Sequence, residues 1–295
     1  MKTFLAIVAS TALLTTGVRA AVSVDGTLDA GYGSPLAIQT INTGFGDSTV
    51  GDGTSTGGSE LDAGYGTIQG GTLYLFLSGN FEANGNHINI FLADGRAGQG
   101  TLNIGGGTFS TMNGSIFSPG FSATYGLDLN DYQGTLYIDY ADLVGNTTGY
   151  LGSVPLTGGV GSGTLGGIQF GLNNKNAAGV NGSAGAANAS AAAAVNTGLE
   201  LAIPLSLLGN PSSDVKVLAD INGGGDSYLS NQFLPGLAVG TGNVGGGGPY
   251  TGPSAGTFNF GSTPGEYFTV PVPEPSSIAL FGLAAIAFGL RARKH

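Results

Sequence analysis

The sequence predicts an all-β protein: a single antiparallel β-sandwich, jelly-roll-like, with about ten strands and long glycine-rich loops. Glycine makes up 57 of 295 residues, well above the usual ~7%, and the glycines separate short apolar runs as turns separate strands. Hydrophobic residues make up 41% of the chain and charged residues only 9%, which argues against a fully disordered chain. The sequence contains neither βαβ alternation nor a long amphipathic helix, so parallel-sheet and helical classes are not indicated.

The first pair of strands is predicted at 65–69 and 72–78. These β-prone runs flank Gly70 and Gly71, and two glycines between two such runs are typical of a tight hairpin.

The next strand, 87–93, places Ile88, Ile90 and Leu92 on one face, because side chains alternate between the two faces of a strand. Further strands are predicted, in chain order, at 134–143, 163–172, 198–209, 214–221 and 265–272. Within the third of these, residues 205–208 follow a proline and predict a helical turn.

Two segments are predicted to be long loops. Residues 43–60 are polar and rich in glycine, and residues 176–194 are a low-complexity stretch of alanine, glycine and asparagine. A break between two β-domains near 105–120 is an alternative, but one domain over 21–271 is favoured because apolar strands continue on both sides without a clear linker.

Residues 1–20 have the three parts of a secretory signal peptide. Lys2 precedes an apolar run over 4–14, and small residues precede a predicted cut between Ala20 and Ala21. The apolar run is shorter than the ~20 residues needed to span a membrane. We therefore expect a cleaved signal helix and an exported protein.

Charge and residue usage restrict the chemistry. Removing both ends leaves three basic residues against seventeen acidic ones, so we expect no nucleic-acid partner. The chain has no cysteine, which excludes disulfides and cysteine-ligated metals. Only His87 would remain after loss of the tail, so a multi-histidine metal site is excluded and a Ser-His-Asp triad would need a histidine inside a strand.

An enzyme is not indicated. Paired carboxylates could hydrolyse glycosides, but nothing in the sequence marks a pair among the candidates Glu82, Asp128, Asp139 and Glu200. Tryptophan is absent, which weakens a sugar-binding cleft. The tyrosines that could replace it are Tyr74, Tyr125, Tyr137 and Tyr140, and such residues more often pack in or on a sheet.

Asp220, Asn222 and Asp226 are candidate ligands for a calcium ion. These residues lie on the glycine-rich stretch DINGGGDS, and calcium takes oxygen ligands of this kind. The spacing differs from the EF-hand pattern. No other cofactor is expected.

The C-terminal 24 residues combine three features: Val272-Pro273-Glu274-Pro275, an apolar run over 276–290, and the basic residues Arg291, Arg293 and Lys294. An apolar run with a basic flank stops transfer and keeps the flank in the cytoplasm. As a helix, 15 residues would span about 22 Å, against a hydrocarbon core of about 30 Å. Such a short transmembrane helix suits a temporary anchor better than a permanent one.

The order and terminal position of these features resemble the PEP-CTERM sorting signal of Gram-negative bacteria, also described as an ice-binding-protein C-terminal domain. The resemblance covers residues 272–295. It implies exosortase as the partner, cleavage near Glu274, and transient contact with the inner membrane.

A looser resemblance concerns the body. Residues 60–102, followed by Glu200, Ala202, Ile203, Pro204 and Leu208 in the pattern E-x-A-I-P-x-x-x-L, are similar to family 9 carbohydrate-binding modules and DOMON-like sandwiches. This implies a sandwich, without transferring any sugar or calcium ligand.

Together these features predict a non-enzymatic protein that is exported through the inner membrane as a membrane-anchored precursor. After tail processing it would lie at the cell surface or outside the cell, associated with exopolysaccharide or biofilm. The alternative is a surface carbohydrate-binding module with a sugar site on the sandwich.

Overall fold

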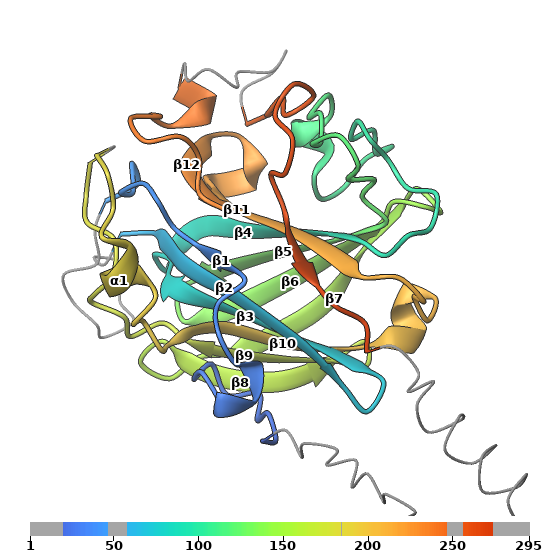
Figure 1. The fold of residues 1–295 in the computed structure, drawn as a ribbon, viewed down its shortest axis with the longest axis horizontal. Coiled ribbons are helices and arrows are strands. Elements are labelled where there is room, and N and C mark those ends of the chain that lie inside the picture. The colour runs from blue at the N-terminus through green and yellow to red at the C-terminus, as the bar shows by residue number, and fades with distance from the viewer. Residues whose placement is uncertain (1–19, 47–57, 184, 247–255, 274–295) are drawn as a thin grey trace, which may run out of the picture.

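The computed structural model describes residues 20–46, 58–183, 185–246 and 256–273. Two antiparallel sheets pack face to face as a β-sandwich (Figure 1). Most of the predicted signal peptide and all of 274–295 lie outside the described residues. Within them, no helix is long and apolar enough to cross a membrane.

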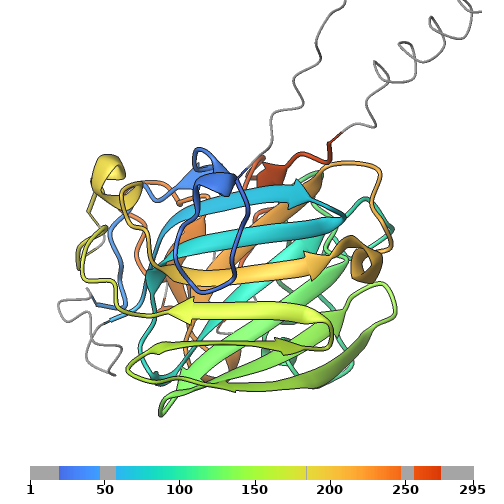
Figure 2. The same cartoon turned by 90° about the horizontal axis from the view of Figure 1, so that it is seen from below.

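The first sheet has six strands in the order β1-β2-β3-β10-β9-β8. Their bounds are β1 (Ala37–Ile38), β2 (Glu60–Gln69), β3 (Thr72–Asn80), β10 (Gly198–Pro204), β9 (Ile168–Asn173) and β8 (Val160–Leu165). Figure 2 shows this sheet with the N-terminal segment, in dark blue, crossing its outer face.

The second sheet has seven strands, with the path β12-β11-β4-β5-β6-β7 and β13 paired to β11 beside that path. Their bounds are β12 (Leu229–Leu234), β11 (Val215–Asn222), β4 (Asn84–Ala93), β5 (Tyr125–Tyr132), β6 (Thr135–Asp142), β7 (Thr147–Pro155) and β13 (Phe268–Val270). β13 pairs with the first half of β11 and β12 with the second half.

The helical elements are short. The described residues contain α1 (Ala189–Ala192) and the 3₁₀ turns η1 (Ala30–Tyr32), η2 (Ser110–Met112), η3 (Leu205–Leu208), η4 (Gly224–Asp226) and η5 (Val244–Gly246). The helical turn predicted at 205–208 is confirmed as η3. The predicted loop 176–194 contains α1, where the Asn188 side chain accepts hydrogen bonds from the first backbone N–H groups and starts the helix.

The Gly70-Gly71 hairpin is confirmed, since both glycines have positive φ and join β2 to β3. The same signal at Gly166-Gly167 joins β8 to β9, so the prediction of one strand over 163–172 is wrong. β5, β7 and β12 were not predicted. The described residues therefore form thirteen strands instead of about ten.

An inter-sheet core fills the space between the two sheets. Ile88, Ile90 and Leu92 all lie in it, as their alternation predicts. Phe91 points to the opposite face of β4 and belongs to a second cluster.

This second cluster, here called the outer core, covers the outer face of the seven-stranded sheet. It is built largely from phenylalanines of the segments 97–123 and 256–267 and of the sheet itself: Phe91, Phe109, Phe117, Phe121, Phe233, Phe258 and Phe260. The Phe258 ring centroid lies 4.8 Å from that of Phe260 and 5.8 Å from that of Phe233. The long loops are thus held on the sheet by buried aromatic contacts.

Glu200 attaches the N-terminal segment to the six-stranded sheet. Its carboxylate accepts hydrogen bonds from the backbone N–H groups of Asp25 and Gly26 and from the Tyr32 hydroxyl, at 2.9, 3.0 and 2.8 Å. Tyr32 in turn packs on Phe76 of β3.

Candidate functional site: a buried acidic cluster

Polar side chains replace the phenylalanines at one end of the outer face of the seven-stranded sheet. Asn89 of β4 pairs in register with Asp128 of β5 on one side and with Asp220 of β11 on the other. Asp139 of β6 pairs in register with Asp128. Because residues in register on neighbouring strands face the same way, one row across four strands carries three carboxylates and an amide.

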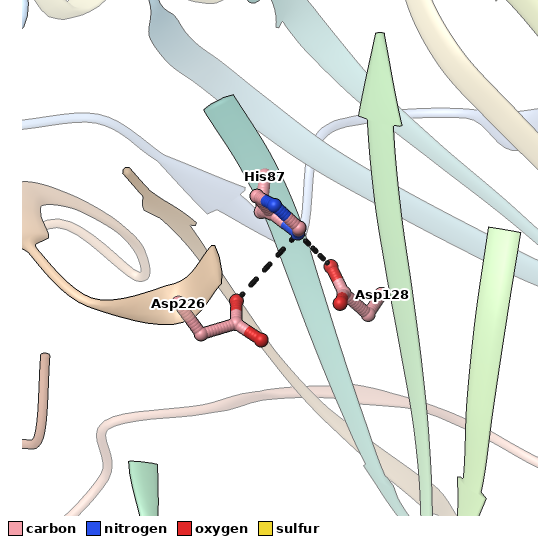
Figure 3. Close-up of side chains that lie close together, drawn as sticks. All are labelled: His87, Asp128 and Asp226. Carbon is pink, nitrogen blue, oxygen red and sulfur yellow. Dashed lines mark hydrogen bonds and ion pairs between the residues drawn. The ribbon is translucent and has the colours of Figure 1, made fainter. Parts of the chain in front are cut away.

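A turn after β11 adds a fourth carboxylate. η4 contains Gly225 and Asp226, which both have positive φ, and this conformation directs Asp226 back over the sheet. Figure 3 shows Asp226 and Asp128 on either side of the His87 ring. His87 Nδ1 lies 2.6 Å from Asp128 Oδ1 and 3.7 Å from Asp226 Oδ1.

Asn89 links the two carboxylates. Its Nδ2 donates hydrogen bonds to Asp226 Oδ1 at 2.9 Å and to Asp128 Oδ1 at 3.3 Å. The Thr108 hydroxyl donates to Asp128 Oδ2 at 2.5 Å. Asp128 is therefore held on both oxygens, which fixes its orientation.

Three buried oxygen atoms in this row lack hydrogen-bond partners. Both carboxylate oxygens of Asp220 and the Oδ1 atom of Asn89 are buried without a hydrogen bond. Asp220 and Asn89 are both 0% exposed. An uncompensated buried carboxylate is costly, so each such group in a folded protein needs an explanation.

The carboxylates perturb one another. Burial raises the pKa of Asp226 to about 7, and the charge of Asp128 adds to this rise. Burial, with the charges of Asp226 and Asp128, raises the pKa of Asp220 well above its usual value. Clusters of carboxylates with raised pKa values are common where a protein binds a cation or performs proton chemistry.

The backbone of η4 identifies the protonated nitrogen of His87. Gly225 donates its N–H to His87 Nε2 at 3.2 Å, so Nε2 carries the lone pair and Nδ1–H donates to Asp128. Burial lowers the pKa of His87, but the hydrogen bond and charge of Asp128 outweigh it and raise the pKa overall. Protonating Nε2 would place two N–H donors against each other, so the hydrogen bond from Gly225 requires the neutral ring. The neighbouring carboxylates nevertheless favour protonation of this ring.

The cluster opens to solvent through a pocket of about 240 Å³. Its lining includes His87, Thr108, Asp128, Asp139 and Asp226. Oxygen atoms from several strands thus converge at the base of a small polar opening, an arrangement that can hold a cation or share protons among carboxyl groups.

Two of the three residues predicted as calcium ligands, Asp220 and Asp226, lie in this cluster. The third, Asn222, uses its Oδ1 to accept hydrogen bonds from the N–H groups of Gly223 and Tyr228, so it shapes the turn. Sequence reasoning did not connect His87 or Asp128 with this site. The sequence does carry a signal for these two residues. Polar and apolar residues alternate along β4 and β5, which places His87 and Asp128 on the face opposite the inter-sheet core.

The other predicted candidates are dispersed. Of the four carboxylates considered for hydrolysis, Asp128 and Asp139 are neighbours, whereas Glu200 binds the N-terminal segment on the other sheet and Glu82 accepts a hydrogen bond from Asn84. Tyr125 and Tyr140 stack with ring centroids 6.0 Å apart.

The described part of the sorting motif adjoins the last strand. The Val272 N–H donates to Asp214 Oδ1 at 3.1 Å, and Pro273 follows it. Glu274, Pro275, Arg291, Arg293 and Lys294 lie outside the described residues. At the other terminus, the predicted cleavage residues Ala20 and Ala21 are described, and the Ala20 carbonyl accepts a hydrogen bond from Gln69 Nε2 at 3.4 Å.

Comparison with known proteins gives one match. No curated protein matches the chain, and no solved structure does, so the likeness of the body to family 9 carbohydrate-binding modules and DOMON-like sandwiches stays a prediction. Residues 271–294 match the family model of the PEP-CTERM protein-sorting motif. The chain is thus a β-sandwich protein that carries a PEP-CTERM sorting motif, which supports exosortase-dependent sorting to the cell surface.

Proposed function

We propose that the protein is a non-enzymatic component of the bacterial cell surface or extracellular matrix, exported, processed by exosortase and associated with exopolysaccharide or biofilm. The PEP-CTERM motif over residues 271–294 carries this proposal. An exosortase substrate must first be exported, which agrees with a signal peptide cut before Ala21.

The proposed processing route uses both ends of the chain. The apolar run 276–290 would pause in the inner membrane, and Arg291, Arg293 and Lys294 would hold the cytoplasmic side. Cleavage near Glu274 would then release the sandwich from this short transmembrane helix.

Intact-mass analysis of the protein secreted by the producing bacterium tests this route. We expect the mass of a chain that begins at Ala21 and ends near Glu274. Deleting the exosortase gene should leave the precursor with its tail attached in the membrane fraction. A secreted protein that still carries residues 276–295 would contradict the proposal.

A carbohydrate-binding module is the second candidate. The observation that favours it is that β5, β6 and β7 carry exposed tyrosines: Tyr132 is 46%, Tyr137 36% and Tyr150 58% exposed. Tyr150 pairs in register with Asp139 of the pocket rim. Sugar rings pack on exposed aromatic faces, so this surface could bind the polysaccharide directly.

Binding to the producer's own polysaccharide separates the two candidates. A saturable interaction that is lost in the double variant Tyr137→Ala and Tyr150→Ala would favour the carbohydrate-binding module. Tyr74→Ala, on the six-stranded sheet, is the matched control and should retain binding. Absence of saturable binding by the wild-type protein would leave the matrix component as the better candidate.

A further inference from the structure

We propose that the buried acidic cluster is a binding site for a hard divalent cation of the Ca²⁺ type, held by carboxylate oxygens of Asp128 and Asp226. One oxygen of each of these residues lies within 4.8 Å of the other, close enough to share an ion. This inference does not depend on the sorting route or on polysaccharide binding. It rests on charge, on unpartnered oxygen atoms and on the state of His87.

The first argument is charge balance. Asp128, Asp220 and Asp226 are 4%, 0% and 3% exposed, and buried charges require compensation. Within the part of the chain that the structure describes, no lysine or arginine forms an ion pair with them. Arg96 pairs instead with Asp94, at 2.6 Å. A divalent cation would allow these carboxyl groups to remain ionised in the fold instead of taking up protons.

The second argument is the set of unused oxygen atoms. Both oxygens of Asp220 and Oδ1 of Asn89 are buried without partners, although they belong to the same row of the sheet as Asp128. Calcium takes six to eight oxygen ligands from carboxylates, amide carbonyls and water. A cation held by Asp128 and Asp226 would also offset the buried negative charge that Asp220 shares with these two carboxylates.

The third argument concerns the kind of metal. His87 Nδ1 carries a proton that it donates to Asp128, and Nε2 accepts from Gly225. Both ring nitrogens are thus engaged, so the ring orients a carboxylate and offers no free lone pair to a metal. Oxygen-only sets favour Ca²⁺, Mg²⁺ and Mn²⁺ over Zn²⁺ or Cu²⁺.

The pocket supplies the remaining coordination and an entry path. Asp128 and Asp226 face an opening of about 240 Å³, with Thr108 and Asp139 on its wall. This volume admits water molecules, which complete the shell of many bound calcium ions.

Thermal unfolding of the mature protein in EDTA and in CaCl₂ tests the site. Extracellular calcium modules have Kd values of about 10⁻⁴–10⁻³ M. A hundredfold excess of calcium over Kd should raise the Tm by about 5–10 °C for a domain of this size. An unchanged Tm with Ca²⁺, Mg²⁺ and Mn²⁺, together with no heat of binding by calorimetry, would overturn the proposal.

Variants locate the effect. Asp128→Asn and Asp226→Asn should each abolish most of the calcium-dependent rise. Glu266→Gln is the matched control, because Glu266 is also a buried carboxylate with an unpartnered oxygen but lies outside the cluster, and it should keep the full rise. A rise that survives in both aspartate variants, or one produced only by Zn²⁺, would overturn the assignment of oxygen ligands.

A measurement on the unmodified full chain covers the case in which these variants fail to fold. His87 and His295 are the two histidines of the sequence. Bound Mn²⁺ should broaden the ring NMR signals of His87 at substoichiometric concentration and leave those of His295 sharp, and calcium should reverse this effect. Equal broadening of both histidines would contradict a specific site.

Discussion

Replacing Glu266 with glutamine should stabilise the protein at about pH 8 and leave its stability near pH 4 almost unchanged. Glu266 precedes β13 and is 8% exposed, and its Oε1 has no hydrogen-bond partner. Burial raises the pKa of Glu266 from 4.5 to about 7.

The sign follows from the direction of this shift. Below the unfolded pKa of 4.5 the carboxyl group is protonated in both states, and its contribution to stability is complete. As pH rises to the folded pKa, about 7, the unfolded state loses its proton first, so the free energy of unfolding falls. At 1.36 kcal/mol per pH unit this shift is worth at most about 3 kcal/mol.

Urea denaturation followed by circular dichroism measures the effect. With an m-value of about 2–3 kcal/mol per molar urea, the Glu266→Gln midpoint should exceed the wild-type midpoint by about 1 M near pH 8. Near pH 4 the two midpoints should coincide within about 0.2 M. An equal difference at both pH values would refute the reasoning, because a packing effect of the amide would not depend on protonation.

Three further predictions concern packing and attachment. Phe258→Ala should lower the free energy of unfolding in urea by about 3–5 kcal/mol, since its ring packs within the outer core; a loss below about 1 kcal/mol would contradict tight packing there. Gly66→Ala should lower the Tm by an amount equivalent to about 1–3 kcal/mol, because the added Cβ would collide with Val270; an unchanged Tm would exclude this contact. Glu200→Ala should speed limited proteolysis within residues 20–33, because the Glu200 carboxylate accepts hydrogen bonds from the N–H groups of Asp25 and Gly26 in this segment. An unaltered cleavage rate would show that Glu200 does not hold the segment on the sheet.

Much of the sandwich could be predicted because its inner faces follow a simple rule. β3, β4 and β11 alternate or run apolar toward the inter-sheet core, and the double glycine before β3 marks the hairpin. β12 could not be recognised in the same way. Its central residues Ser230, Asn231 and Gln232 are fully buried yet polar. The Asn231 side chain donates hydrogen bonds to the carbonyls of Asn42 and Thr241, and Gln232 Oε1 accepts one from the Leu61 N–H of β2.

The acidic cluster illustrates a second limit. His87, Asp128 and Asp226 come from distant parts of the chain, and only the register of β4, β5 and β11 brings them together. The glycine-rich turn at 220–227 could be singled out because its ligand-like residues are adjacent in sequence. The pairing partners of a strand are set by packing across the whole sheet, so the remaining members of the site required the structure.

On the proposed sorting route, the position of the last strand determines which end of β11 follows the tether most closely along the chain. Val270, two residues before Val272 of the sorting motif, pairs with Val215 at the start of β11. Asp220 lies five residues beyond Val215 along β11, or about 17 Å away. In a precursor tethered through its C-terminus, the start of β11 would therefore be the nearer end of this strand to the last described residues, and the acidic cluster would lie toward the other end. The pocket of this cluster would already meet the ions and polymers of the outside while the precursor still awaits cleavage.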